Sequence, residues 1–211
     1  MQPTAATPLD TAPADYDEIL TEGTIRIGVL MGSEAVLYVK TGQGGTIYGQ
    51  DNHFLRMAEM VRERYGLSVF VSATENDRKE VFQTEMEWLR ERIPNPHSPI
   101  YCFGYSKGGL ITCWHGVEEP RVRRILTVNA PLMVNFHNRT VPALRTMAQR
   151  WPSDGMTMVY GTLDPSYPFV PFLQNRARVE ILEGTDHNMV GSPLSFFDMV
   201  ERWLLFDVPR V

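Results

Sequence analysis

Short apolar runs alternate with amphipathic helical patterns along most of this chain, and this alternation limits the folds open to it. Seven runs have the length and β-branched content of strands: TIRIGVL, AVLYVKT, LSVFVSA, IYCFGY, RRILTVNA, MTMVYG and RVEILEG. Helical patterns lie between them, such as the stripe Phe54, Ala58, Val61 and Tyr65. Helices that join successive strands require crossover connections. The pattern therefore predicts an α/β fold with a mostly parallel sheet covered by helices on both faces.

Local signals predict where some of these elements begin and which ones adjoin. Residues 31–34 separate the first two runs, which predicts a hairpin or two adjacent strands. Asp77, followed by Glu80 three residues later, predicts a capping box at the start of a helix. The last helical pattern extends from Pro193 to about Phe206.

The chain of 211 residues divides by composition into a short arm and one domain. Residues 1–23 are rich in Pro, Ala, Thr and Asp and lack periodicity, which predicts a flexible tail or a surface arm. Residues 24–211 are expected to form a single α/β domain. The N-terminus has no basic segment followed by an apolar one, and no run approaches the ~18 apolar residues of a membrane span. We therefore expect a soluble, cytoplasmic protein.

Charge and cysteine content exclude some classes of partner and of stabilising bond. The formal net charge is −5 and basic residues are scattered among acidic ones, which disfavours a nucleic-acid partner. Cys102 and Cys113 are the only cysteines, so no disulfide framework is expected and both are predicted to pack as small apolar residues in a reducing compartment.

The strand IYCFGY runs directly into a glycine-flanked serine. Gly104-Tyr105-Ser106-Lys107-Gly108 has the pattern GxSxG between an apolar strand and an amphipathic helix. A tight strand-to-helix turn of this kind exposes the serine Oγ at the helix N-terminus, as a nucleophile requires. The pattern also fits a glycine-rich turn whose serine merely caps the helix.

A nucleophilic serine needs a base and a group that orients the base. Of the five histidines, His187 alone follows a strand end and is flanked by a glycine and an acid, in the sequence EGTDHNMVG. The acid is placed at Asp164 in the strand-end sequence YGTLD, although Asp-Pro is also a common turn. Asp186 is the rival acid, but adjacent side chains rarely face each other.

With Ser106, Asp164 and His187 in this order at three strand ends, the chain resembles the α/β-hydrolase superfamily over roughly residues 24–206. The resemblance implies an eight-stranded, mostly parallel sheet, with Ser106 as nucleophile, His187 as general base and Asp164 as its orienting acid. It also implies an oxyanion hole formed by the N–H groups of Lys107 and Gln43. Gln43 lies in the sequence TGQGG, where Thr41 stands at the position that is usually a histidine in this superfamily.

These residues predict a serine hydrolase acting on a small-molecule carboxylic ester through an acyl-enzyme, without metal or cofactor. The short stretch between Asn129 and Gly155 predicts little or no cap domain and an open cleft. Four residues are predicted to line the substrate cleft: Tyr105, Phe136, Tyr167 and Met189. Thioesterase, peptidase and acyltransferase activities use the same triad, and nothing in the sequence specifies an oligomeric state.

Two readings from other classes compete with the hydrolase. The sequence GQGGTIYG could form a nucleotide-binding turn with Glu75 as a ribose ligand, but its glycines do not follow GxGxxG. A hydrolase-like scaffold could also serve as a non-catalytic binding protein, because fold alone proves no function. Retention of serine, acid and histidine in order argues against it.

Overall fold

The computed structural model describes residues 15–133, 136–151, 155–173 and 176–211, and its centre is one eight-stranded sheet. The strands are β1 (Glu18–Glu22), β2 (Ile25–Leu30), β3 (Ser33–Lys40), β4 (Leu67–Ser72), β5 (Ile100–Tyr105), β6 (Val122–Val128), β7 (Met156–Gly161) and β8 (Arg178–Leu182). Their spatial order is β1-β2-β4-β3-β5-β6-β7-β8. β2 is antiparallel to both of its neighbours, and all pairs from β4–β3 to β7–β8 are parallel. The predicted mostly parallel sheet is confirmed.

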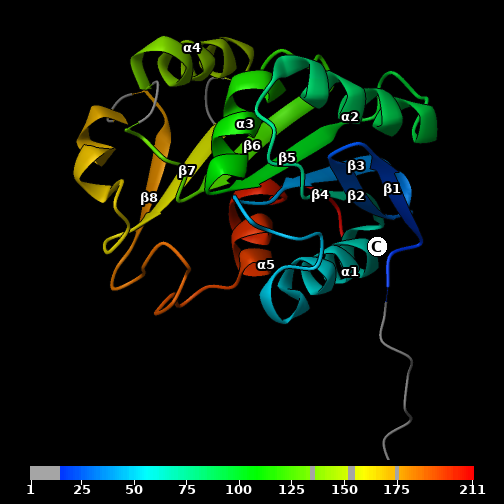
Figure 1. The fold of residues 1–211 in the computed structure, drawn as a ribbon, viewed down its shortest axis with the longest axis horizontal. Helices are drawn as coiled ribbons and strands as arrows, with labels where there is room; N and C mark the ends of the chain where they lie inside the picture. Colours follow the sequence, from blue (N-terminus) through cyan, green and yellow to red (C-terminus); the bar gives the residue numbers. More distant parts are fainter. Residues whose placement is uncertain (1–14, 134–135, 152–154, 174–175) are drawn as a thin grey trace, which may run out of the picture.

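Helices cover both faces of the sheet (Figure 1). α2 (Lys79–Arg92), α3 (Lys107–Gly116) and α4 (Val141–Arg150) pack on one face, and α1 (His53–Tyr65) and α5 (Phe196–Met199) pack on the other. Shorter 3-10 and π-helical segments complete the fold: Gln50–Asn52, Phe136–Thr140, Tyr167–Leu173 and Val200–Leu204. Among the described residues, no helix combines the length and the apolar character needed to cross a bilayer.

The central strands are buried on both sides, as their continuous apolar runs require. In β3, Val36 and Tyr38 join the apolar cluster under α2–α4, whereas Leu37 and Val39 join the cluster under α1 and α5. Cys102 and Cys113 are both buried and free, which confirms their expected packing as small apolar residues. Burial also raises the pKa of the Cys113 thiol to about 12, so it remains protonated.

The expectation that the first two runs are adjacent is wrong, because β4 lies between β2 and β3. Ile27 of β2 is paired with Ser72 of β4, and Val36 of β3 is paired with Ser68 of the same strand. The segment between β2 and β3 is held instead by β4, where Gly32 N–H donates to Ser68 Oγ at 2.9 Å. Apolar patterning specifies that a segment is a strand, but leaves its partner open.

Part of the predicted N-terminal tail is a strand. β1 is antiparallel to β2 and is connected to it through Gly23, whose φ is +56°. Arg92 of α2 forms an ion pair with Glu18 at 2.7 Å. The five residues of β1 include only two apolar side chains, Ile19 and Leu20, which are adjacent and so give no alternation that would reveal a strand. Pairing with β2 supplies what the local pattern lacks. Residues 1–14 of the predicted tail lie outside the described residues.

The predicted capping box at Asp77 and Glu80 is wrong. Asn76 Oδ1 accepts from Arg78 N–H at 3.0 Å, and this Asx turn delays the start of α2, whose N-cap is Arg78. A capping box does occur at Ser195 and Asp198, where α5 begins. Because Ser195 is the N-cap, the final helix begins at Phe196 and not at Pro193 as the sequence pattern predicts.

Candidate active site

Ser106 occupies the sharp turn between β5 and α3. Its backbone has φ 51° and ψ −127°, a region that non-glycine residues rarely adopt and that stores strain. Two backbone hydrogen bonds hold the turn: Ser106 N–H donates to Val128 C=O and Gly109 N–H donates to Ser106 C=O, both at 2.8 Å. The side chain of Ser106 makes no hydrogen bond that caps α3. The geometry thus differs from that of a serine that caps a helix.

The glycines around Ser106 let α3 approach the sheet closely. A Cβ added at Gly104 would lie 2.6 Å from Gly109 Cα and would overlap the hydroxyl of Thr112. A Cβ added at Gly108 would lie 2.7 Å from the carbonyl carbon of Lys40. Side chains at either position would push the helix away from β3 and β5 and would open the turn.

The structure brings Ser106, His187 and Asp164 together in one hydrogen-bonded chain. His187 Nε2 lies 2.9 Å from Ser106 Oγ, and His187 Nδ1 lies 2.6 Å from Asp164 Oδ2. With Nδ1–H donating to the carboxylate, Nε2 is left as the acceptor for the serine proton. The Asp164 side chain is fully buried, whereas that of His187 is 37% exposed.

The carboxylate of Asp164 controls the protonation of His187. The hydrogen bond that His187 donates to Asp164 raises the pKa of His187 above its ordinary value, partial burial opposes this, and the charges of Asp164 and Asp186 add to the increase. Asp164 Oδ1 accepts from Ser166 N–H at 2.6 Å, so both of its oxygens are held.

The rival acid, Asp186, has a different partner. Its Oδ1 accepts from Val190 N–H at 2.9 Å and closes the turn that follows β8. Among the described acidic residues, only Asp164 has a hydrogen bond to the imidazole of His187. Two other histidines bond to backbone elsewhere: His53 to Gln50 C=O and His115 to Asp77 C=O. His97 is exposed, and the side chain of His137 lies outside the described residues.

Comparison with solved structures identifies the architecture. A serine hydrolase homologue from Coxiella burnetii superposes with a TM-score of 0.65 at 14% identity, over 90% of this chain and 98% of that one. A dienelactone hydrolase from Anabaena variabilis gives 0.66 at 14% identity, over 93% and 99%. A serine hydrolase without a lid from Xanthomonas campestris gives 0.62 at 14% identity, over 91% and 96%.

The chain has the α/β-hydrolase fold. Neither the protein-family models nor the curated proteins match its sequence. At identities this low the likeness extends to the fold, and the chemistry has to be argued from the site itself.

In the α/β-hydrolase fold the oxyanion donors are backbone N–H groups after the nucleophile and after an early strand. Lys107 is the first residue of α3, so its N–H has no acceptor within the helix. Residues 41–45, named the oxyanion loop for the role expected of Gln43, lie against the turn, because a Cβ added at Gly42 would be 3.0 Å from Ser106 Cβ. Gln43 is exposed at the tip of this loop.

Glu75, considered above as a ribose ligand, instead contacts the oxyanion loop. Its Oε1 accepts from Gly44 N–H at 2.6 Å. Gly44 has a φ of +70°, so the loop turns where glycine is favoured. The carboxylate is thereby engaged by the protein's own backbone, which does not favour the nucleotide-binding reading.

A cleft of about 820 Å³ extends from the oxyanion loop to the segment of residues 188–196. Of the four predicted cleft residues, Tyr105 and Met189 line it. Tyr167 does not, because it begins the 3-10 segment that packs against the apolar cluster under α2–α4. The side chain of Phe136 lies outside the described residues. Phe196, which the sequence reading missed, forms part of the cleft and stacks on Phe54 with ring centroids 5.6 Å apart.

Asn129 is a second residue that the sequence reading missed. It follows β6, has a φ of 50°, and is fully buried. Its Nδ2 donates to the carbonyls of Asp186 and His187 at 3.0 and 3.1 Å, while its Oδ1 accepts from Gly161 N–H at 3.0 Å. Tyr105 OH also donates to His187 C=O, at 2.7 Å. The backbone of His187 is therefore held from two sides.

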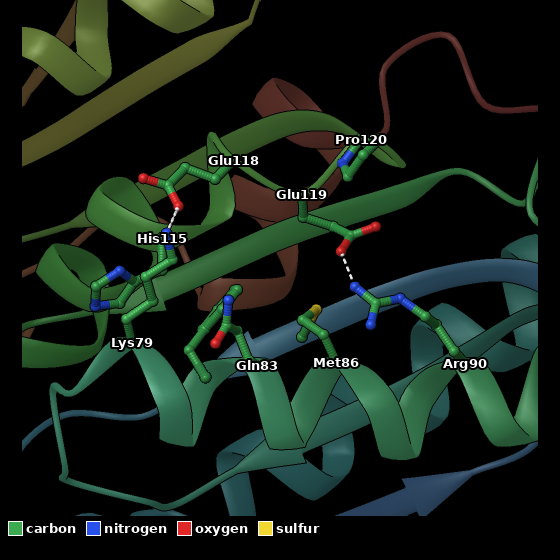
Figure 2. Close-up of a pocket in the computed structure, with 9 residues that line it drawn as sticks. Lys79, Gln83, Met86, Arg90, His115, Glu118, Glu119 and Pro120 are labelled. Atoms are coloured by element: carbon green, nitrogen blue, oxygen red, sulfur yellow. Dashed lines mark hydrogen bonds and ion pairs between the residues drawn. The ribbon is translucent and has the colours of Figure 1, made fainter.

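A second hollow, of about 150 Å³, lies between α2 and the end of α3 (Figure 2). Figure 2 shows its charged side chains paired across it, Lys79 with Glu118 at 2.6 Å and Arg90 with Glu119 at 2.5 Å. Within the described part of the chain, no three His, Cys, Asp or Glu side chains cluster as a metal site would require.

Proposed function

We propose that the chain is a serine hydrolase that cleaves small or medium carboxylic esters through an acyl-enzyme. The observation that carries the proposal is the unbroken chain from Ser106 Oγ to His187 and from His187 to Asp164. The strained φ of Ser106 supports it, because strain of this kind concentrates at functional sites.

In the first half of the reaction, Ser106 Oγ attacks the ester carbonyl carbon while His187 Nε2 takes the serine proton. The carbonyl oxygen becomes an oxyanion, which the N–H groups of Gln43 and Lys107 stabilise. The tetrahedral intermediate then collapses as the C–O bond to the alcohol breaks. His187 gives its proton to the leaving alkoxide, and an acyl-serine remains.

In the second half, a water molecule takes the place of the alcohol. His187 removes one proton from the water as its oxygen attacks the acyl carbon. The proton then passes to Ser106 Oγ as the acyl–serine bond breaks, which releases the carboxylic acid. Asp164 stabilises the imidazolium that forms in each half.

The preference for small or medium esters rests on the open cleft. The segment between β6 and β7 contains α4. This helix packs on the sheet through its side chains Leu144 and Met147 and does not cover the cleft. The likeness to a Xanthomonas campestris hydrolase without a lid supports the same expectation. Phe196, Tyr105 and Met189 provide apolar surface for the acyl or alcohol group.

A fluorophosphonate probe tests the mechanism. The parent should be labelled at one serine, and Ser106→Ala should abolish the labelling. Ser98→Ala is the matched control, because Ser98 is buried before β5 and its Oγ has no hydrogen-bond partner within the described structure. A folded parent that resists the probe would contradict the proposal. A panel of p-nitrophenyl esters, acyl-CoA thioesters and aminopeptidase substrates then distinguishes esterase from thioesterase, transferase and peptidase activity.

A further inference from the structure

Four buried polar side chains lie beneath the oxyanion loop, and the reaction proposed above assigns none of them a step. This buried polar cluster consists of Tyr38 and Lys40 on β3, Ser72 at the end of β4 and Glu85 on α2. Lys40, Ser72 and Glu85 are completely inaccessible to water. Excluding an ammonium and a carboxylate from water is costly, so a fully buried pair is poor evidence of a stabilising role alone.

The contacts within the cluster satisfy every donor of the ammonium group. Lys40 Nζ donates to Glu85 Oε1 at 2.7 Å, to Glu85 Oε2 at 2.8 Å and to Ser72 Oγ at 3.0 Å. Ser72 Oγ donates in turn to Glu85 Oε1 at 2.7 Å, and Tyr38 OH donates to Glu85 Oε2. Burial raises the pKa of Tyr38 well above its ordinary value, so the phenol remains a donor. Burial lowers the pKa of Lys40, and the charge of Glu85 opposes that effect.

The backbone of Lys40 carries this anchoring to the site. Lys40 is paired with Ser72 on one side and with Gly104 of the nucleophile turn on the other. Thr41 N–H donates to Ser72 C=O at 3.0 Å. The first turn of α3 rests on the carbonyl groups of Lys40 and Thr41, where no side chain fits at Gly108. Two residues beyond Lys40, Gly42 contacts Ser106.

We propose that Lys40, held by Glu85 and Ser72, is a positioning residue that fixes the oxyanion loop so that Gln43 N–H meets the developing oxyanion. The inference rests on the proposed function, because the oxyanion forms only in that reaction. The exposed carboxylate of Glu75 holds the outer side of the loop through Gly44, and Lys40 at the end of β3 holds its inner side. A displacement of about 1 Å at a reacting group can cost about 100-fold in rate.

The test removes both charges together. Lys40→Met alone would leave the Glu85 carboxylate buried and unpaired, so the variant is Lys40→Met/Glu85→Gln, whose amide keeps a partner for Tyr38 and Ser72. We expect kcat to fall about 10-fold to 100-fold while KM stays near the parent value. The affinity for a boronic acid that mimics the tetrahedral intermediate should fall by the same factor, because only that species uses the oxyanion donors.

Arg90→Met/Glu119→Gln is the matched control. It removes the ion pair between α2 and the turn before β6 that Figure 2 shows. This turn lies where β5 and β6 begin, whereas Ser106 follows the opposite end of β5. We expect this control to lose stability but to keep the parent kcat. Parent kcat in a folded Lys40→Met/Glu85→Gln protein would overturn the inference, and so would an equal loss of kcat in the control.

Two further measurements keep the inference decidable. Ser72→Ala leaves both charges in place and serves as the test if the double variant does not fold. A fall of about 3-fold to 10-fold in the kcat of Ser72→Ala supports the inference, and the parent kcat in this variant overturns it. If the parent resists the fluorophosphonate, the proposed function fails, and amide hydrogen exchange still measures the anchoring. If amides of residues 41–49 exchange faster in Lys40→Met/Glu85→Gln but not in the control, the anchoring of the loop by Lys40 is supported. If both variants exchange at the same rate, the anchoring is contradicted.

Discussion

Oδ2 of Asp164 lies 2.6 Å from Nδ1 of His187, although the two residues are 23 positions apart in the chain. Asp164 follows β7 and His187 follows β8, and these strands are parallel neighbours whose carboxyl ends meet at one edge of the sheet. The carboxylate is buried, whereas the imidazole is partly exposed to solvent and its Nε2 faces Ser106 Oγ. Asp164 therefore sets both the tautomer and the pKa of His187.

Replacing Asp164 should cost far more activity than replacing its rival acid. Asp164→Asn should lower kcat by about 10⁴-fold, because the amide no longer holds the Nδ1–H tautomer. Asp186→Asn should keep kcat within a few-fold of the parent, since Asp186 bonds to Val190 N–H. Steady-state kinetics on p-nitrophenyl acetate measure both variants. Full activity in Asp164→Asn together with a loss in Asp186→Asn would reverse the assignment.

Activity should increase with pH through the raised pKa of His187. The hydrogen bond that His187 donates to Asp164 raises that pKa above its ordinary value of 6.5, and a base must be neutral, so the inflection in kcat/KM should lie above 6.5. The effect on stability has the opposite sign. The Asp164–His187 pair stabilises the fold fully below the unfolded pKa, and this contribution is lost as pH rises through the folded pKa.

A pH profile of kcat/KM for the parent and for Asp164→Asn measures this. The residual activity of Asp164→Asn should show its inflection at lower pH, because the variant lacks the hydrogen bond that contributes most to the raised pKa of His187. Thermal unfolding of the parent should show the stability contribution decreasing over the same pH interval in which activity increases. An inflection below 6.5 in the parent would contradict the role given to Asp164.

Asn129 should support His187 through its backbone. Asn129→Ala removes the donor shared by the carbonyls of Asp186 and His187 and the acceptor of Gly161 N–H, at a position whose φ is 50°. We expect kcat to fall about 10-fold to 100-fold and the free energy of unfolding to fall by about 1–3 kcal/mol. Asn129→Asp keeps the acceptor for Gly161 and should recover part of the stability but little of kcat. Urea unfolding and kinetics separate the two effects.

Two glycines of α3 should respond differently to a methyl group. Gly108→Ala places a Cβ 2.7 Å from the carbonyl carbon of Lys40, a backbone atom that cannot yield, so we expect a severe loss of folded protein. Gly116→Ala meets two side-chain atoms, Ile125 Cδ1 at 3.3 Å and Cys102 Sγ at 3.9 Å, and gains helix propensity of up to about 1 kcal/mol. Expression yield and thermal unfolding of the two variants provide the comparison. Equal stability would contradict the close approach of α3 to β3.

Met189 should influence the choice of acyl chain. Met189→Ala enlarges the cleft beside Tyr105, and we expect kcat/KM for longer p-nitrophenyl esters to change relative to the acetate by about 10-fold. Tyr167→Ala should lower the melting temperature without altering that ratio, because Tyr167 packs against the core. If this ratio changed in Tyr167→Ala and not in Met189→Ala, the acyl chain would bind near Tyr167, and the assignment of the cleft beside Tyr105 and Met189 would be wrong.

The order of strands illustrates what local patterns leave open. The runs that become β3, β5 and β7 are recognisable from apolar residues between turn signals, and their helices from the periodic stripes. That β4 lies between β2 and β3 is not visible locally, because β4 pairs with both through backbone groups that every residue has. The strand β1 was missed for the same reason, since its pairing with β2 and not its composition makes it a strand.

The sequence by itself determined the alternation of strands and helices and the three strand ends that bear Ser106, Asp164 and His187. Glycine flanks and apolar runs encode these locally, and parallel strands deliver their ends to one edge. The tertiary structure alone decided that Asp164 and not Asp186 bonds to His187, and that Lys40 meets Glu85 and Ser72. Such contacts depend on which strands are neighbours and which helix lies above them, and residues distant in the chain carry no local signal of that arrangement.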